Sequence, residues 1–259
     1  MSNAQVKSAV RAFEILEHFR LSQQPRTMSE LSVDLGYPLS STTVLLKTLV
    51  NLGYLNYDRV RRVYFPTPKV TGLGDWVPRA LFGPSKIIDA MNDVHAQTSE
   101  GIFIGTRNDV YLQYLKTKQS IHALRFYIEE GTVRPITQSV AGWVLLSTMP
   151  DDKVENMVRR ANIATPNPSE RVLVRDMFKR IEEIRQRGFG WVEGVPFPGG
   201  ATIAVLMPGT ILESPVTLGL GGAQERVRKN LDKYLAALLD AARTAKSSEQ
   251  FATPIHIEL

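Results

Sequence analysis

The apolar residues in the first quarter of the chain predict three helices. The first is expected over residues 6–20, where apolar residues recur every three or four positions with charges between them: Val6, Val10, Phe13, Leu16 and Phe19. A second, short helix is expected to begin after Thr27, because Glu30 follows three residues later in a capping-box spacing, and to stop at Gly36. The pattern therefore predicts a long helix followed by a short one.

The third helix is predicted from Ser40 or Ser41, either of which can cap it, to Asn51. A turn of about four residues separates it from the second helix, which is the spacing of a helix-turn-helix. On a helical wheel the apolar face holds Thr42, Leu45, Leu49 and Leu52, and the outer face holds Ser40, Thr43, Lys47 and Asn51, with Val44 at its edge. These short outer side chains could approach a duplex closely.

Two short strands are predicted after the third helix, over residues 54–57 and 63–65. The turn between them carries Asp58, Arg59, Arg61 and Arg62. A basic hairpin in this place is a wing that could lie along DNA phosphates or enter the minor groove. Each of these features is also common in structures without such a role, and it is their order and spacing that favours DNA binding.

The excess of positive charge lies in the same part of the chain. The net charge of 259 residues is +5, and residues 1–70 hold nine Lys and Arg against five Asp and Glu, which gives +4. A basic segment attracts polyanions, nucleic acid above all, although modest basicity alone is more often a solvated surface.

Composition excludes several classes of site. The chain has no cysteine, so disulfides, thiolate zinc sites and cysteine nucleophiles are excluded. It has no apolar run long enough for a membrane span and no cleavage-like signal pattern, so a cytoplasmic protein is expected. The four histidines lack metal-ligand spacing, and "TLGLGG" at residues 217–222 lacks the full dinucleotide motif. We therefore expect no catalytic residues, no metal and no cofactor.

The rest of the chain predicts a sheet with helices on its faces. Residues 69–90 are rich in Gly and Pro, so a broken or kinked helix is expected there. Helices are expected at 87–96, after Ser139, after a cap at Asp151, before Gly188, and as one amphipathic segment from residue 224 to 246. Strands are expected in residues 100–117 around an Arg-Asn-Asp turn, at 123–131 ("ALRFYIEEG"), and near 189–193, 201–207 and 215–220.

Four segments resemble the IclR family of bacterial transcription regulators: "MSELSVDLGYPLSSTTVLLKTLVNLGYL" (28–55), "GTVRPITQSVAGWVLLS" (131–147), "IEEIRQRGFGWVEG" (181–194) and "ATIAVLMPG" (201–209). The resemblance implies an α+β protein. It implies a winged helix-turn-helix domain over residues 1–68, a linker helix over 69–90, a GAF-like effector-binding domain with a mainly antiparallel sheet over 91–246, and a tail over 247–259.

The resemblance also implies the DNA-binding residues, which come from the third helix, the wing and the start of the second helix: Arg26, Ser40, Ser41, Thr43, Val44, Lys47, Arg59, Arg61 and Arg62. The family commonly has lysine and arginine where this chain has Leu39 and Val44. Either the wing and Lys47 supply more of the affinity, or DNA is bound weakly.

The implied effector-binding residues are Thr137, Ser139, Val140, Ala141, Glu193 and Thr202. A helix beginning near residues 139–142 would favour an anionic group such as a carboxylate. The alternative is that the hydroxyls of Thr137, Ser139 and Thr202 only satisfy local backbone groups. Trp143, Gly219 and Gly221 depart from the family's usual residues, which points to a different ligand.

The function implied is a ligand-responsive transcriptional regulator that binds double-stranded DNA as a homodimer or dimer of dimers, with a small organic acid as effector. The competing hypothesis is a metabolite-binding or catalytic module whose N-terminal domain mainly serves dimerisation. Leu39 and Val44 keep this second hypothesis open.

Overall fold

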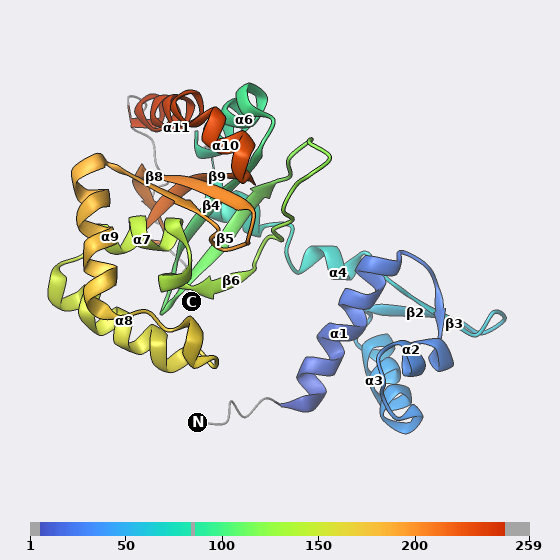
Figure 1. Ribbon diagram of the computed structural model, residues 1–259. Helices are drawn as coiled ribbons and strands as arrows, with labels where there is room; N and C mark the ends of the chain where they lie inside the picture. Colours follow the sequence, from blue (N-terminus) through green and yellow to red (C-terminus); the bar gives the residue numbers. More distant parts are fainter. Residues whose placement is uncertain (1–5, 84–85, 247–259) are drawn as a thin grey trace. The chain divides into compact units, whose positions relative to one another are not determined.

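The computed structural model describes residues 6–83 and 86–246 (Figure 1). The chain divides into two compact units, with the boundary between Arg79 and Ala80. The first unit, called the head below, contains α1 (Lys7–Ser22), β1 (Arg26–Thr27), α2 (Met28–Asp34), α3 (Leu39–Asn51), β2 (Leu55–Asp58), β3 (Val63–Pro66) and α4 (Lys69–Gly72). The helix α5 (Val77–Phe82) crosses the boundary.

The short helix α2 begins as its sequence predicts. Thr27 accepts a hydrogen bond from the backbone N–H of Glu30 at 3.2 Å, and the Glu30 carboxylate accepts one from the backbone N–H of Thr27 at 2.7 Å. This capping box satisfies two amides that the first turn of a helix leaves unpaired. Gly36, at φ 67°, then turns the chain toward α3.

The core faces of α1 and α3 differ from the predicted ones. In α1, Ile15 and Phe19 are buried, whereas Phe13 is 64% exposed. In α3, the buried residues are Thr42, Leu46 and Leu49. Leu46 was missing from the predicted face. Leu52, predicted to be buried, is the residue after the last helical turn and is exposed, because the chain turns away from the helix there.

Neither Ser40 nor Ser41 caps α3. The helix begins at Leu39 with Pro38 at the cap position, so both serines lie inside its first turn. Pro38 has no side-chain donor or acceptor, so no side chain caps the first turn of α3. The strands β2 and β3 confirm the predicted wing, and β1, which was not predicted, extends it to a three-stranded sheet in the order β1-β3-β2.

The second unit, called the sensor below, is a six-stranded antiparallel sheet between two layers of helices (Figure 1). Its strands are β4 (Gly101–Asn108), β5 (Tyr111–Lys118), β6 (Val133–Pro135), β7 (Phe189–Glu193), β8 (Gly200–Ile211) and β9 (Ser214–Ala223), in the order β6-β5-β4-β9-β8-β7. Its helices are α6 (Ile87–Thr98), α7 (Val140–Ser147), α8 (Asp151–Ala164), α9 (Val174–Arg187), α10 (Gln224–Lys229) and α11 (Leu231–Lys246), with short 3-10 turns at Ile136–Gln138 and Pro168–Glu170.

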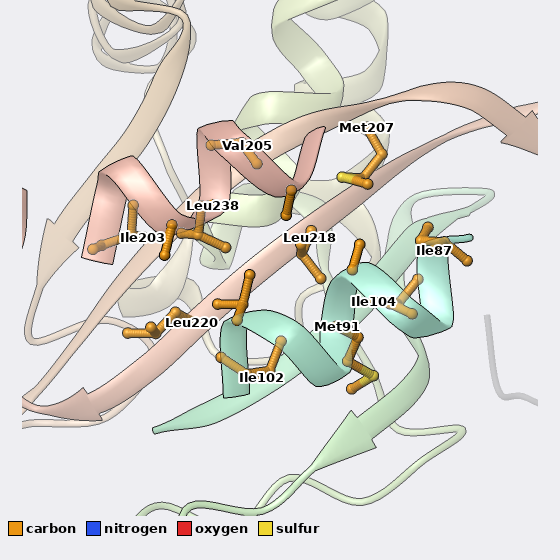
Figure 2. Close-up of a cluster of buried hydrophobic side chains, with 14 of the residues drawn as sticks. Ile87, Met91, Ile102, Ile104, Ile203, Val205, Met207, Leu218, Leu220 and Leu238 are labelled. Carbon is orange, nitrogen blue, oxygen red and sulfur yellow. The ribbon is translucent and has the colours of Figure 1, made fainter. Parts of the chain in front are cut away.

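The two faces of this sheet carry side chains of different size. Toward α6 and α11, the central strands present branched apolar side chains that form one core cluster (Figure 2), including Ile102, Ile104, Ile203, Val205, Leu218 and Leu220. Toward α7, α8 and α9, the same strands alternate to residues such as Phe103, Thr202, Gly219 and Gly221, and a second cluster forms around α7. The face toward α7 is therefore the one with room for a cavity.

The segment 123–131, predicted to be a strand, is not one. Its residues alternate in exposure, since Leu124 and Tyr127 are exposed while Phe126 and Ile128 line a cavity. The alternation therefore comes from facing the cavity or the solvent and not from pairing with a neighbouring strand. The strand that pairs with β5 in this region is the later β6.

Two further helix predictions need correction. Asp151 does not cap α8, because Pro150 holds the cap position and the Asp151 carboxylate instead pairs with Arg185 at 2.8 Å. The predicted final helix is interrupted at Asn230, which separates α10 from α11. The predicted stop of α9 at Gly188, at φ 79°, is confirmed.

Residues 69–90 hold α4, α5 and the first turn of α6, so the helix expected there is broken, as its Gly and Pro residues predict. None of the described helices is both long and apolar enough to cross a membrane. The predicted tail at 247–259 lies outside the described residues.

Candidate nucleic-acid interface and ligand cavity

The outer face of α3 exposes a row of short side chains around one lysine: Ser40, Val44, Lys47, Thr48 and Asn51. Thr43 does not belong to this row. Its hydroxyl donates to the Leu39 carbonyl at 2.7 Å and contacts the Met28 sulfur at 2.9 Å, so it is used inside the head. The predicted apolar face included Leu52 and omitted Leu46, and this rotation of the face placed Thr43 on the outside.

This face suits a groove of DNA. Val44 is 65% exposed and offers methyl groups of the kind that contact thymine, and Lys47 offers a cation to a guanine edge or a phosphate. Ser40 is exposed and Ser41 is half-buried, so the two serines do not present the same surface. Leu39 is 49% exposed and adds no charge.

The wing brings three arginines together on one turn. The Asp58 carboxylate accepts hydrogen bonds from the backbone N–H groups of Val60 at 2.9 Å and Arg61 at 3.0 Å, which fixes the turn. Arg59, Arg61 and Arg62 are exposed around Val60, which is 94% exposed at the tip. Such a tip can neutralise phosphates whatever the base sequence.

Arg26 differs from the wing arginines. It lies on β1 opposite Tyr64 of β3 and is half-buried, and its Nε atom is buried with no acceptor among the described residues. Its position before α2 separates it from the tip of the wing. Of the predicted basic residues, the structure therefore groups the three wing arginines, and it places Lys47 on α3 and Arg26 on β1.

Contacts between α1 and the turn before α3 hold the helix-turn-helix together. The Tyr37 hydroxyl donates to the Glu14 carboxylate, and the Arg11 guanidinium lies 4.6 Å from the centre of the Tyr37 ring. After α3, the Lys69 ammonium donates to the Leu52 carbonyl at 2.8 Å, at the negative end of the helix dipole. The recognition surface is thus fixed from both ends of α3.

The sensor contains a cavity on the α7 side of its sheet. The space between its walls is about 570 Å³, including the open side. Most of the wall is apolar or backbone, with aromatic rings from four segments of the chain: Phe103, Tyr114, Phe126 and Phe197. The rings of Phe126 and Phe197 stack in parallel, 5.3 Å apart.

Glycines in the sheet make the cavity possible. Gly101 on β4 and Gly221 on β9 face each other. A Cβ added to Gly200 would lie only 3.0 Å from a carbon of the Phe126 ring, so a side chain there would crowd the ring. A Cβ on Gly221 would meet nothing closer than 3.8 Å, so this glycine opens space instead of relieving a clash.

Four of the six predicted effector residues line this cavity: Ser139, Val140, Ala141 and Thr202. The Ser139 hydroxyl accepts from the backbone N–H of Gly142 at 3.0 Å as the cap of α7, and the Thr202 hydroxyl donates to the Val195 carbonyl at 3.3 Å. Both hydroxyls therefore also serve the local backbone, as the alternative interpretation expected.

Thr137 and Glu193 do not line the cavity. Thr137 is buried, and its carbonyl accepts from the Trp143 indole at 2.7 Å. Glu193 lies in an ion pair with Arg228 and also accepts from Gln224 at 3.1 Å. The hydrogen bond from Arg228 lowers the pKa of Glu193, so this carboxylate is charged and already partnered.

A buried ion pair lies close to the cavity wall. Glu100 is fully buried, and its carboxylate accepts from the Arg226 Nη2 atom at 2.8 Å and from the Tyr234 hydroxyl at 3.4 Å. Arg226 also donates to the Leu124 carbonyl at 3.2 Å, and the His122 Nε2 atom lies 3.9 Å from Glu100. The hydrogen bond to Glu100 raises the pKa of Arg226. This pair anchors the segment that carries Phe126.

Sequence reasoning missed Tyr114, Phe126 and Phe197. They lie on β5 and on two irregular segments, and only the fold brings them together. No local spacing marks such residues. Among residues 6–83 and 86–246, no group of three or more His, Asp and Glu side chains is arranged to hold a metal ion.

Comparison with known families gives two matches that together span most of the chain. Residues 8–59 match the family described as the IclR helix-turn-helix domain, and residues 85–247 match the bacterial transcriptional regulator IclR C-terminal family. The chain is also 26% identical to the HTH-type transcriptional regulator KdgR of Dickeya chrysanthemi, over 92% of this chain and 78% of that protein. For KdgR of Escherichia coli K12 the identity is 24%, over 92% and 90%.

Solved structures agree with these matches. The sensor is 46% identical to an effector domain described as belonging to an IclR transcriptional regulator from Acinetobacter sp. ADP1, with a TM-score of 0.62 over 66% of this chain and 99% of that one. The IclR protein of Thermotoga maritima has the same fold, with a TM-score of 0.74 over 94% of this chain and 98% of that chain, at 16% identity.

Proposed function

The chain belongs to the IclR family of bacterial transcriptional regulators, and from this premise we propose how its head and its sensor share the work. It is a ligand-responsive regulator with a DNA-binding head. In the proposal, two or four copies bind an inverted-repeat site, because one helix-turn-helix contacts too few base pairs for useful specificity. The protein would work in the cytoplasm, without catalysis and without a cofactor.

The observation that carries this proposal is the division of the head surface. The outer face of α3 presents Val44 and Lys47 with short side chains on either side, and the turn at Asp58 presents three exposed arginines. The first surface can read base edges, and the second can neutralise phosphates. Together they supply both terms of sequence-specific binding.

The effector in this proposal is a small organic acid bound in the sensor cavity. The aromatic wall supports it, since a largely apolar cavity with few polar groups is the usual form of a small-molecule site. Binding must favour one arrangement of the paired heads over another, because a ligand with equal affinity for both arrangements changes nothing.

The proposal is tested by selecting DNA fragments from a random library with the full chain, at two salt concentrations. We expect an inverted repeat that survives at the higher concentration. Binding that is unspecific and lost at the higher salt would contradict the proposal. The mass of the complex in solution then distinguishes a dimer from a dimer of dimers on the selected site.

Two variants separate the roles of α3 and the wing. Replacing Arg61 and Arg62 with Ala should weaken binding to all sequences and reduce the slope of log K against log salt by about 1.8, at about 0.9 for each lost phosphate contact. Lys47→Ala should also change the preferred sites. Arg159→Ala, in an exposed pair on α8, is the control and should change neither. Unchanged binding by all the head variants would contradict the assignment of these residues.

A further inference from the structure

We propose that residues 195–198 form a lid on the sensor cavity, and that the Phe197 ring must leave its place in the wall before a ligand can enter. This inference rests on the proposed role of the cavity as the effector site. It concerns how a ligand reaches that site and which residues control its entry.

The cavity in this structure is too small for an organic acid. Its walls enclose a wide space with an open side, but the volume open to a water molecule is about 30 Å³. One water molecule needs roughly 10–15 Å³ in this measure, so the cavity holds about two waters and no larger molecule. Part of the wall must therefore move before an effector can bind.

Most of the wall is held by secondary structure or by a well-anchored segment. The strands β4, β5, β8 and β9 and the helix α7 supply one part of it, and the irregular segment 119–132 supplies another. This segment is anchored in its middle, where Arg226 donates to the Leu124 carbonyl at 3.2 Å. It is anchored again near its end, where the Gly131 N–H donates to the Tyr114 carbonyl at 2.8 Å.

The part of the wall between β7 and β8 has the form of a lid. Its residues 195–198 stand between Gly194, at φ 74°, and Gly199, at φ 75°. Glycine adopts this left-handed region and the ordinary regions with similar ease, so both positions can change their torsions at little cost and act as hinges. Residues 195–197 line the cavity, so a rotation about these hinges would move the wall itself.

The Phe197 ring holds the lid closed. It stacks on Phe126 with the ring centres 5.3 Å apart, and the Arg134 guanidinium lies 4.7 Å from its centre. The Gly200 N–H also donates to the Phe197 carbonyl at 3.0 Å. Ring contacts of these two kinds each change a population by roughly two- to tenfold, so the lid can open while the rest of the sensor stays folded.

Opening the lid would have two linked effects. It would break the hydrogen bond from the Gly200 N–H to the Phe197 carbonyl, which exposes this amide to exchange with solvent. It would also open a path to Gly221, which lines the cavity wall on β9. A ligand that binds only while the lid is open has its affinity reduced by the open fraction.

Hydrogen exchange of the full chain, followed by NMR at pH 7, tests the motion. We expect the Gly200 amide to exchange about a hundredfold faster than the Gly131 amide, after correction for their intrinsic rates. Both amides are hydrogen-bonded, but only Gly131 belongs to the anchored segment. Equal protection of the two amides would overturn the proposal.

Thiol labelling tests access to the cavity, because the chain has no cysteine of its own. Gly221→Cys places a thiol on the cavity wall, and Ile163→Cys places one on α8, where Ile163 is 82% exposed. With excess dithiodipyridine, the cavity thiol should react more slowly than the exposed one, by a factor within about tenfold of the protection of the Gly200 amide. Equal reaction of the two thiols, or a slowing outside that range, would overturn the lid.

Two variants test the contacts of the Phe197 ring. Phe197→Ala removes both ring contacts and should accelerate Gly200 exchange and Gly221→Cys labelling together, by about tenfold. Arg134→Gln removes one contact and should accelerate both by about threefold. Exchange at Gly131 should not change in either variant. Unchanged rates in Phe197→Ala, or acceleration at Gly131 as well, would contradict a local lid.

Arg180→Gln is the matched control, because the Arg180 guanidinium also lies over an aromatic ring, 4.5 Å from the centre of the Trp143 ring, and Trp143 does not line the cavity. It should change neither rate. These measurements involve neither DNA nor an effector, so their failure would overturn the lid and leave the proposed function standing. Failure of the DNA selection would do the reverse.

Discussion

The head and the sensor place their functional groups in opposite environments. In the head, Val44, Lys47 and the wing arginines project from the surface, and the fold beneath them is held by local contacts such as the capping box at Thr27. In the sensor, the groups around the cavity are buried, and their partners come from distant segments, as Glu100 and Arg226 show. A change in the head should therefore affect binding more than folding, and a change around the cavity should do the reverse.

The largest expected effect comes from removing one partner of the buried ion pair in the sensor. Arg226→Ala leaves the Glu100 carboxylate buried without its cation, so the free energy of unfolding should fall by about 3 kcal/mol. Urea unfolding followed by tryptophan fluorescence measures this change.

Arg228→Ala is the control on the same helix. Arg228 also pairs with a carboxylate, Glu193, but it is 59% exposed, so its loss should shift the unfolding midpoint much less. Equal shifts of the unfolding midpoint in Arg226→Ala and Arg228→Ala would contradict the claim that the buried ion pair stabilises the fold more than the exposed one.

A smaller effect is expected at the glycines of β9. Gly219→Ser should lower the free energy of unfolding by about 2 kcal/mol, because a Cβ there would lie 2.1 Å from an atom of the Phe103 ring and force it to move. Gly221→Ser, two residues along the same strand, puts its Cβ at an ordinary contact distance of 3.8 Å from the Thr202 hydroxyl and should stay within about 0.5 kcal/mol of the parent chain. Similar losses at both positions would show that the Phe103 contact is not the cause.

In the head, Thr27→Ala should cost about 1 kcal/mol by removing the side-chain cap of α2. Hydrogen bonds from Thr27 lower the pKa of Glu30 below its ordinary 4.5. A lowered carboxyl pKa stabilises the fold at neutral pH, and this contribution is lost as the pH falls below 4.5 toward the lowered value.

The cost of Thr27→Ala should therefore shrink in thermal unfolding at acidic pH. Thr48→Ala, an exposed site inside α3, is the control and should cost nothing measurable at any of these pH values. The backbone N–H of residue 27, the larger cause of the lowered Glu30 pKa, is retained in Thr27→Ala, so a constant cost across the pH range would show that the Thr27 hydroxyl contributes nothing to that lowering.

The smallest effect is expected on the outer face of α3. Val44→Ala should weaken binding to the selected DNA site by about threefold, through lost methyl contacts, and change the preferred base at one position. Thr43→Ser should leave affinity and preference unchanged, because the hydroxyl is used within the head. A changed base preference in Thr43→Ser would show that Thr43 contacts DNA after all. Anisotropy titrations with labelled duplexes measure both.

The same contrast explains what could be predicted from the sequence. The capping box at Thr27, the turn before α3 and the basic wing are local, and their spacing is visible in the chain. The family resemblance is confirmed by the matches to both units. Errors in the head were small. Leu52, for example, was assigned to the buried face of α3 in place of Leu46, although α3 ends one residue earlier, at Asn51.

The cavity could be predicted only in part. Ser139 and Thr202 line it as expected, but Glu193 is engaged by Arg228, and no local pattern announces that pairing. The register between distant strands decides which residues share the cavity wall, as between Thr202 and Gly221. Residues 123–131 were predicted to form a strand for the same reason. Their apolar side chains alternate between the cavity and the solvent, and the segment pairs with no neighbouring strand.

The row of glycines on the cavity face of the sheet has an evolutionary consequence. One base change turns any glycine codon into an alanine codon, so at Gly221 a single mutation adds a methyl group to the cavity wall. Because alternate residues such as Leu220 face the other layer, that mutation leaves the opposite core intact. A lineage can therefore change the size of this cavity in small heritable steps, while the surface of the head stays as it is.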